Sequence, residues 1–318
     1  MATFKTRVES VIGTVSSTTL LDTWLSSGAK FVLVQIPSQK LLGYSQEISF
    51  TSSVSLWNRK FVGLSVGGYE PKLVTPGKAT QVADATSLHY ATVLTPAYLV
   101  KGDTIHVFPS GATGSLFAVS YPDVVNTDTA IANFPPELEE GVVLYACITG
   151  LLQRSFDRLA TDIALMAFGT VTAPTAPTGT ITMTLSLPTF VQPVSPFDIT
   201  NSGTYIRTDE DLEKGASELS IQQALLAKYN EDIQNANAVF QADIAKYTAE
   251  LTKGKAETDL ELQQYLGKVQ VYAQQLGYEV NKFSSYATKT KIYLETNQAL
   301  ASTLQAQLTA LIQGFING

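Results

Sequence analysis

Chemically reactive side chains are scarce in this chain of 318 residues. It holds one cysteine and two histidines, and no run of eighteen apolar residues occurs in it. The single cysteine, Cys147, excludes an internal disulfide framework and a cysteine-rich zinc site. Because no apolar run reaches eighteen residues, no segment is expected to span a membrane. The first fifteen residues lack the apolar core of a signal peptide. We expect a protein that is made in the cytoplasm and has no membrane partner.

Charge is also sparse. Charged residues make up 15% of the chain, whereas apolar residues make up 45%. A fold with so few charges can leave less of its surface in water, which is typical of a subunit of a large assembly. The net charge of −7 argues against a protein whose main task is to grip phosphate backbones, because that task depends on Lys and Arg. A surface along which DNA slides without sequence recognition is compatible with this charge.

The residues that could carry catalysis do not form a recognisable motif. His89 and His106 both stand in β-type alternation beside aromatic residues, and no carboxylates flank them at a metal-binding or acid–base spacing. We expect both to be packed or hydrogen-bonded strand residues. Cys147 lies in the apolar run Val142–Ile148, which predicts a buried, inert thiol. The sequence therefore predicts no enzyme activity, no metal and no cofactor.

An 18-residue spacing of apolar side chains dominates the region from 226 to 294. Eighteen residues are five turns of an α-helix, so side chains with this spacing share one face without drifting around the axis. The residues of this 18-residue stripe are Leu226, Tyr229, Ile233, Phe240, Ile244, Tyr247, Leu251, Leu262, Tyr265, Val269, Leu276, Val280 and Phe283. Amide side chains fill the opposite face. We interpret the stripe as an assembly surface.

The helix that carries this stripe is predicted to be long and nearly straight. A turn at Thr252–Lys255 is an alternative, but the 18-residue phase passes through Gly254 unshifted. We therefore expect one continuous helix from about residue 217 to at least residue 283, with residues 284–316 extending it or folding back.

A second strong helix is predicted at residues 136–166. Pro135 and Pro136 preset its first turn, and three glutamates follow where the helix dipole favours negative charge. The residues that form its apolar stripe are Leu138, Val142, Tyr145, Leu152, Phe156, Leu159 and Ile163. Further apolar residues widen the stripe, so this helix is expected to be central and buried on two sides. Gly141 occupies a position where we expect a bulkier residue.

The remaining segments complete an α+β fold. Thr18–Ile36 reads as a helix that Thr18 can cap. Short β-rich runs with frequent turn residues follow, including 60–66, 97–101, 104–108 and 116–121, which indicates an antiparallel barrel or sandwich inserted into a helical core. The expected division is a helical segment at 1–40, the β-domain at 41–132, the central helix at 133–168, a Pro-rich extended segment at 169–208 and the long helical assembly region at 209–318.

The order of several short motifs resembles that of a known class of protein. The motifs are Thr6–Glu9, Trp24-Leu25 before Ile36-Pro37, Ala83–Thr92, Pro96–Tyr98, Gly102–Pro109, Val119–Pro122, Ile131–Pro135 and Glu137–Ala146. Their sequence resembles that of virion structural proteins of tailed bacteriophages, in particular head-to-tail adaptors of the neck. The resemblance covers roughly two-thirds of the chain, and it is the order of the motifs, rather than any one of them, that carries it.

The resemblance implies a structural role in the virion. In such adaptors a ring, commonly of twelve subunits, docks on the portal protein and continues the DNA channel toward the tail or nozzle protein. The expected partners are therefore other copies of the chain, the portal, a tail or nozzle protein, and passing genomic DNA. The alternative is a trimeric tail-fibre or baseplate protein whose long helix forms a three-stranded coiled coil, although the 18-residue period disfavours sustained heptads.

Overall fold

The computed structural model describes residues 2–176, 186–197, 212–254 and 260–318, with the backbone alone for residues 212, 253–254 and 260–262. It confirms an α+β fold with a β-domain set among helices and a long C-terminal helix. The chain forms two compact units, residues 1–150 with 301–318 and residues 151–300. Both boundaries fall inside helices, within α4 (Glu139–Leu165) and α7 (Leu260–Asn317). Each unit is described below by itself.

The first unit begins with two helices, α1 (Phe4–Ile12) and α2 (Thr18–Gln35), and the 3-10 helix η1 (Ser38–Tyr44). The cap of α2 is Ser17, whose hydroxyl accepts from the Leu20 amide, rather than Thr18 as predicted. At the other end of α2, Lys60 Nζ donates to carbonyls of the last turn, including that of Leu33 at 2.6 Å. Burial lowers the pKa of Lys60, and its ammonium group lies at the carbonyl end of α2, where the helix dipole favours positive charge.

The seven strands form one sheet in the order β3-β7-β1-β2-β6-β5-β4, antiparallel except for the parallel pair of β4 and β5. The strands are β1 (Gln46–Thr51), β2 (Ser53–Ser55), β3 (Arg59–Val66), β4 (Lys72–Leu73), β5 (Ala97–Lys101), β6 (Thr104–Phe108) and β7 (Thr113–Ser120). Ser52, with φ of 67°, separates β1, which pairs with β7, from β2, which pairs with β6. Residues of β3, β6 and β7 share one buried core, so the two halves of the sheet pack as in a sandwich.

One helix of this domain was not predicted. Pro76 and Gly77 read as a turn, but they open α3 (Pro76–Ala83), in which Pro76 occupies the first turn. Proline is tolerated there because its missing N–H would have no partner inside the helix. The short edge strand β4 precedes α3, and the segment 84–96 connects α3 to β5.

The central helix begins with η2 (Pro136–Leu138) and continues as α4. In the first unit, Leu138, Val142 and Tyr145 are buried. Gly141 has its packing partners on two other helices: a Cβ there would lie 3.3 Å from Leu308 and 3.4 Å from Val32. The missing side chain therefore allows α2, α4 and the end of α7 to approach closely.

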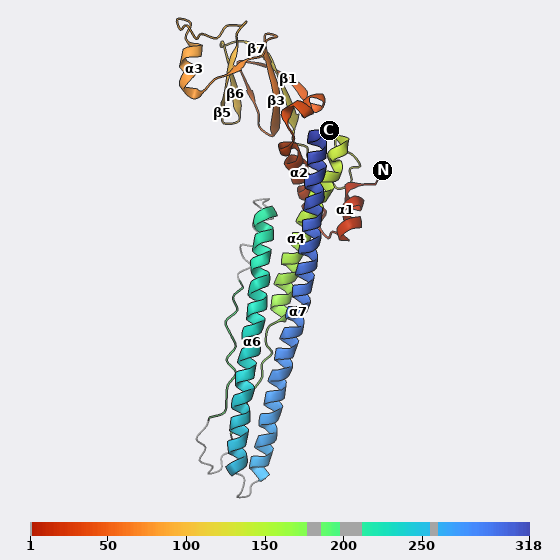
Figure 1. Ribbon diagram of the computed structural model, residues 1–318, viewed down its shortest axis with the longest axis vertical. Coiled ribbons are helices and arrows are strands. Elements are labelled where there is room, and N and C mark those ends of the chain that lie inside the picture. The colour runs from red at the N-terminus through yellow and green to blue at the C-terminus, as the bar shows by residue number, and fades with distance from the viewer. Residues whose placement is uncertain (1, 177–185, 198–211, 255–259) are drawn as a thin grey trace. The chain divides into compact units, whose positions relative to one another are not determined.

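The second unit contains α6 (Leu212–Gly254) and the first part of α7, which run antiparallel side by side (Figure 1). The prediction of one continuous helix from 217 to 283 is wrong. Ring contacts join Tyr229 with Phe283 at 5.3 Å and Phe240 with Tyr272 at 5.5 Å, and Gln241 Nε2 donates to the Ala273 carbonyl at 3.3 Å. These pairs define a helical hairpin, which we call the α6–α7 hairpin.

Candidate assembly surfaces

The 18-residue stripe lies inside the α6–α7 hairpin rather than on an open flank. Its buried members are Leu226, Tyr229, Ile233, Phe240, Ile244, Tyr247, Leu251, Tyr265, Val269, Leu276, Val280 and Phe283. The side chain of the remaining member, Leu262, lies outside the described residues. Val171, Leu187 and Phe190 also pack against this core. The stripe is therefore already covered within one chain, which corrects its interpretation as a surface for a neighbouring subunit.

A pair of tyrosines lies in the hairpin core near its connecting end. The hydroxyls of Tyr247 and Tyr265 are 2.9 Å apart, and their rings meet edge to face. Burial, together with the hydrogen bond to Tyr265, raises the pKa of Tyr247 well above its ordinary value of 10.0. The folded hairpin therefore favours the neutral phenol.

This pair predicts an alkaline limit to stability. Because the pKa of Tyr247 is higher in the folded than in the unfolded state, its stabilising effect is complete below pH 10 and decreases as the pH rises above that value. We expect the urea midpoint of the hairpin to fall above pH 10, as measured by far-ultraviolet circular dichroism. Tyr247→Phe should be less stable at pH 7 but should lose less stability between pH 10 and pH 11. An equal loss in both proteins would contradict this role.

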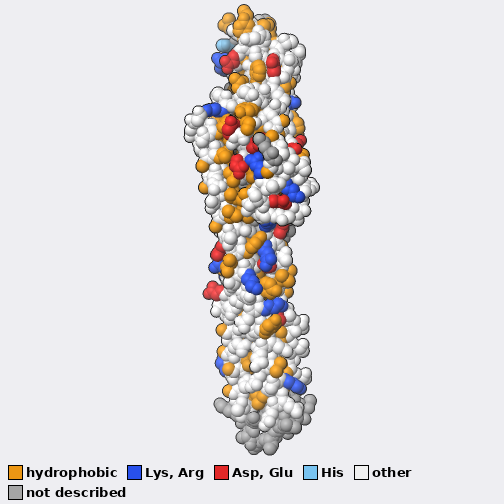
Figure 2. Space-filling model, turned by 90° about the vertical axis from the view of Figure 1, so that its right-hand side faces the viewer, with side chains coloured by type: hydrophobic (Ala, Val, Ile, Leu, Met, Phe, Trp, Pro, Cys, Tyr) orange, Lys and Arg blue, Asp and Glu red, His pale blue; other side chains and the backbone are white. Residues whose placement is uncertain are grey.

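The outer face of α7 carries a second set of apolar residues, which we call the outer row. Val271, Tyr278 and Ile292 are 50%, 67% and 58% exposed. Together with Tyr293 and Leu300 they fall within about 100° of the helix circumference, on the side away from the buried face. Figure 2 looks onto the side on which α7 lies in Figure 1, and its helical part shows hydrophobic side chains between polar ones and Lys or Arg.

The outer face of α6 carries exposed apolar residues and charges of both signs. Ile221 and Val239 are exposed there and are 18 residues apart, so they share one face. Asp232, Lys228 and Lys246 are exposed on the same face, and Asp243, which is half-buried there, pairs with Lys246 at 3.1 Å. Over its length α6 has six acidic residues and four lysines, whereas α7 has three glutamates and four lysines. Over their whole lengths the two helices are thus opposite in net charge, at −2 and +1.

A buried carboxylate links the lower part of α4 to α7 within the second unit. Asp162 is 1% exposed, and its Oδ2 accepts from Arg158 Nε at 2.7 Å and from the Thr290 hydroxyl at 2.6 Å. Among the described residues its Oδ1 has no hydrogen-bond partner. Leu152, Phe156 and Leu159 are buried on the same helix, and Ile163 is half-buried. This polar contact therefore sits among apolar packing and fixes how the two helices align.

The histidines and the cysteine do not converge on a site. His106 lies in β6, whereas His89 lies in the exposed segment after α3, so the prediction that both are strand residues is wrong for His89. Turn hydrogen bonds at Ser87 and Tyr90, rather than strand pairing, hold the backbone there. Cys147 is fully buried in α4, with its Sγ 3.9 Å from the Val8 carbonyl.

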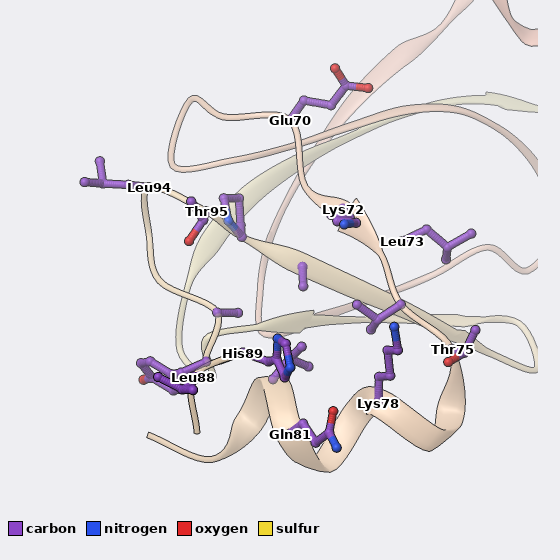
Figure 3. Close-up of a pocket in the computed structure, with 16 residues that line it drawn as sticks. Glu70, Lys72, Leu73, Thr75, Lys78, Gln81, Leu88, His89, Leu94 and Thr95 are labelled. Carbon is purple, nitrogen blue, oxygen red and sulfur yellow. The ribbon is translucent and has the colours of Figure 1, made fainter. Parts of the chain in front are cut away.

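His89 instead borders a cavity of about 600 Å³ in the β-domain (Figure 3). Val74, Val82, Ala91 and Ala97 are buried together beneath it. The exposed residues around the cavity are Glu70, Lys72, Leu73, Thr75, Lys78, Gln81, Leu88, His89, Leu94 and Thr95. The cavity therefore combines an apolar floor with a mixed polar and leucine border.

Within residues 2–176, 186–197, 212–254 and 260–318, no three His, Cys, Asp or Glu side chains are grouped so that they could hold a metal ion. No helix among those residues has the length and hydrophobicity required to cross a membrane.

Comparisons with known proteins leave the family open. No protein-family model matches the chain, and no curated protein matches it. The resemblance of its motif order to phage neck proteins is therefore the basis of a proposal.

Proposed function

We propose that the chain is a non-catalytic structural subunit of a tailed-phage neck. In this role it forms a head-to-tail adaptor ring that docks on the portal protein and continues the DNA channel toward a tail or nozzle protein. The order of motifs from Thr6 to Ala146 supports this role. One of these residues has a clear structural use: Arg7 on α1 pairs with Glu140 at 2.7 Å and Glu139 at 3.6 Å, at the start of the central helix.

The outer faces of the hairpin are the observation that supports self-assembly. A ring forms when one surface of a subunit binds a different surface of the next. The outer row of α7 bears Lys282 and Lys289 beside its apolar residues, whereas the outer face of α6 bears acidic and basic residues beside Ile221 and Val239. Contact between α7 of one subunit and α6 of the next would bury both apolar sets and could place a lysine of α7 beside Asp232. Contact between two copies of α7 would bring lysines together.

A triple substitution tests this contact. We expect Val271→Ser, Tyr278→Ser and Ile292→Ser together to leave the hairpin folded, because these side chains are at least half exposed, but to reduce the oligomer to smaller species. Light scattering measures the mass and circular dichroism the helix content. A matched control replaces the exposed polar residues Gln275, Asn281 and Thr288 by Ser and should keep the native mass. A native mass for the outer-row variant would refute the proposed contact.

A reconstruction of the virion tests the role itself. Density for this chain in a ring of about twelve copies at the neck is the expected result. An acidic or neutral channel is expected with it, because a strongly basic wall would hold DNA by counterion release. Threefold density in a fibre or baseplate would instead support the coiled-coil alternative, which the burial of the stripe within one chain disfavours. Absence of the chain from the virion would refute both.

A further inference from the structure

The cavity of the β-domain has the features of a peptide-binding site. Its volume of about 600 Å³ is within the range of ligand pockets, and its floor of Val74, Val82 and Ala97 is apolar. Leu88 is fully exposed and Leu94 is 66% exposed at its border. Single exposed leucines are common, but leucines that flank an apolar cavity add a surface that water covers poorly.

The segment that presents these leucines is held in one conformation by its own hydrogen bonds. The Asp84 carboxylate accepts from the Thr86 amide at 2.9 Å and from the Thr86 hydroxyl at 2.8 Å, which lowers the pKa of Asp84. Ser87 Oγ accepts from the His89 amide, and Thr92 Oγ1 accepts from the Thr95 amide. A partner would therefore lose little conformational entropy in ordering this border on binding.

The charged groups around the cavity indicate which partner fits it. The border carries two lysines, Lys72 and Lys78, and one carboxylate, Glu70. Its net charge is therefore positive, although that of the whole chain is negative. Thr75, the N-cap residue of α3, makes no side-chain hydrogen bond to the helix, and the first turn of α3 has no acidic residue. The positive end of the α3 dipole thus adds to the attraction of the lysines for an anion. Lys78 extends from α3 toward the cavity (Figure 3).

We propose that this cavity binds an extended segment of a partner protein that places a large apolar side chain over the floor and an adjacent carboxylate at Lys72 and Lys78. The apolar side chain would contact Leu88 and Leu94. Main-chain pairing with the sheet contributes little, because the edge strand β4 has two residues and follows Pro71. Binding at this cavity does not depend on the formation of the proposed ring.

Selection from a random dodecapeptide library displayed on a carrier, with the purified full-length protein as bait, tests the proposal. We expect enriched peptides that combine Asp or Glu with Leu, Phe or Trp. Synthetic copies should bind at least tenfold more weakly to Lys78→Glu and to Leu94→Ser, as measured by fluorescence anisotropy. The matched controls are Lys101→Glu, an exposed lysine outside the cavity, and Trp57→Ser, whose ring is 73% exposed elsewhere. Both should bind as the wild type does.

Several outcomes would overturn the proposal. They are enrichment of basic peptides, enrichment of none, or equal binding by the wild type and both cavity variants. Circular dichroism of each variant shows whether its fold is intact, and Lys78→Met provides a second test because it removes charge at an exposed position without reversing it. If Leu94→Ser lowers the mass of the protein's own oligomer, the occupant is a second copy and the proposed partner is wrong. The outer-row variant should bind the peptides normally, so failure of the ring contact and failure of this site are distinguishable.

Discussion

Replacing Leu226 and Ile244 together by serine is expected to unfold the α6–α7 hairpin rather than to dissociate intact subunits. The two side chains are 1% and 7% exposed inside the hairpin. Loss of each apolar side chain, with a hydroxyl left in its place, should cost about 2–5 kcal/mol. The sites are 18 residues apart, so their effects should nearly add. The sum is comparable to the whole stability of an ordinary domain.

Far-ultraviolet circular dichroism with a urea titration measures this loss. The matched control is Ile221→Ser with Val239→Ser, which makes the same kind of change on the same helix at residues that are 51% and 62% exposed. It should keep the helix content of the wild type. If the Leu226 and Ile244 variant retained a native urea midpoint while its mass fell, these residues would serve the contact between subunits and not the hairpin core.

The sequence predicted the position of the apolar face correctly but not what covers it. Periodicity shows which side chains of a helix avoid water, and a neighbouring segment of the same chain satisfies that need as well as another subunit does. Tyr229 and Phe283 contact each other, and Tyr247 contacts Tyr265 closer to the connection between the helices. Both arms carry the same spacing, so the pattern in the sequence continues past Gly254 without a shift although α6 ends there.

The alternation of side chains and the positions of turn residues predicted much of the β-domain correctly. The predicted ranges of β5 and β6 agree with the structure, because β-branched and aromatic residues alternate there between clear turns. The same rules missed α3, since Pro76 and Gly77 favour a turn as strongly as the start of a helix. The pairing of β4 with β5 joins segments that α3 separates, and no local pattern in the sequence indicates it.

The surfaces proposed for binding were the least predictable from the sequence. Val271, Tyr278 and Ile292 are single apolar residues on a polar face, and only the burial of the other face shows that they are exposed. Leu88 and Leu94 lie in an irregular segment without periodicity, so their position beside Lys78 depends on the fold. The start of α3 was a signal that could have been found, because Thr75 followed by Pro76 fits the N-cap and first position of a helix.

Replacing Arg158 by methionine is expected to destabilise the second unit by about 3 kcal/mol, at the lower end of the range for a broken buried pair because the guanidinium is half exposed. The methionine keeps most of the apolar stem, but Asp162 is left buried, and within the described part of the chain its remaining partner is the Thr290 hydroxyl. A urea titration at pH 7 measures the loss. Lys291→Met is the matched control, since its pair with Glu295 is 3.9 Å long and exposed, and its effect should stay within about 0.5 kcal/mol.

A second substitution separates the cost of the unpaired charge from the loss of packing. The double variant Arg158→Met with Asp162→Leu removes the buried carboxylate as well as its partner, and it places an apolar side chain at a buried position of the helix that also buries Phe156 and Leu159. We expect it to recover at least half of the stability lost by Arg158→Met, because apolar replacement of a whole buried pair is often neutral. A double variant that is less stable than Arg158→Met alone would show that the carboxylate stabilises the contact between α4 and α7 even without its arginine.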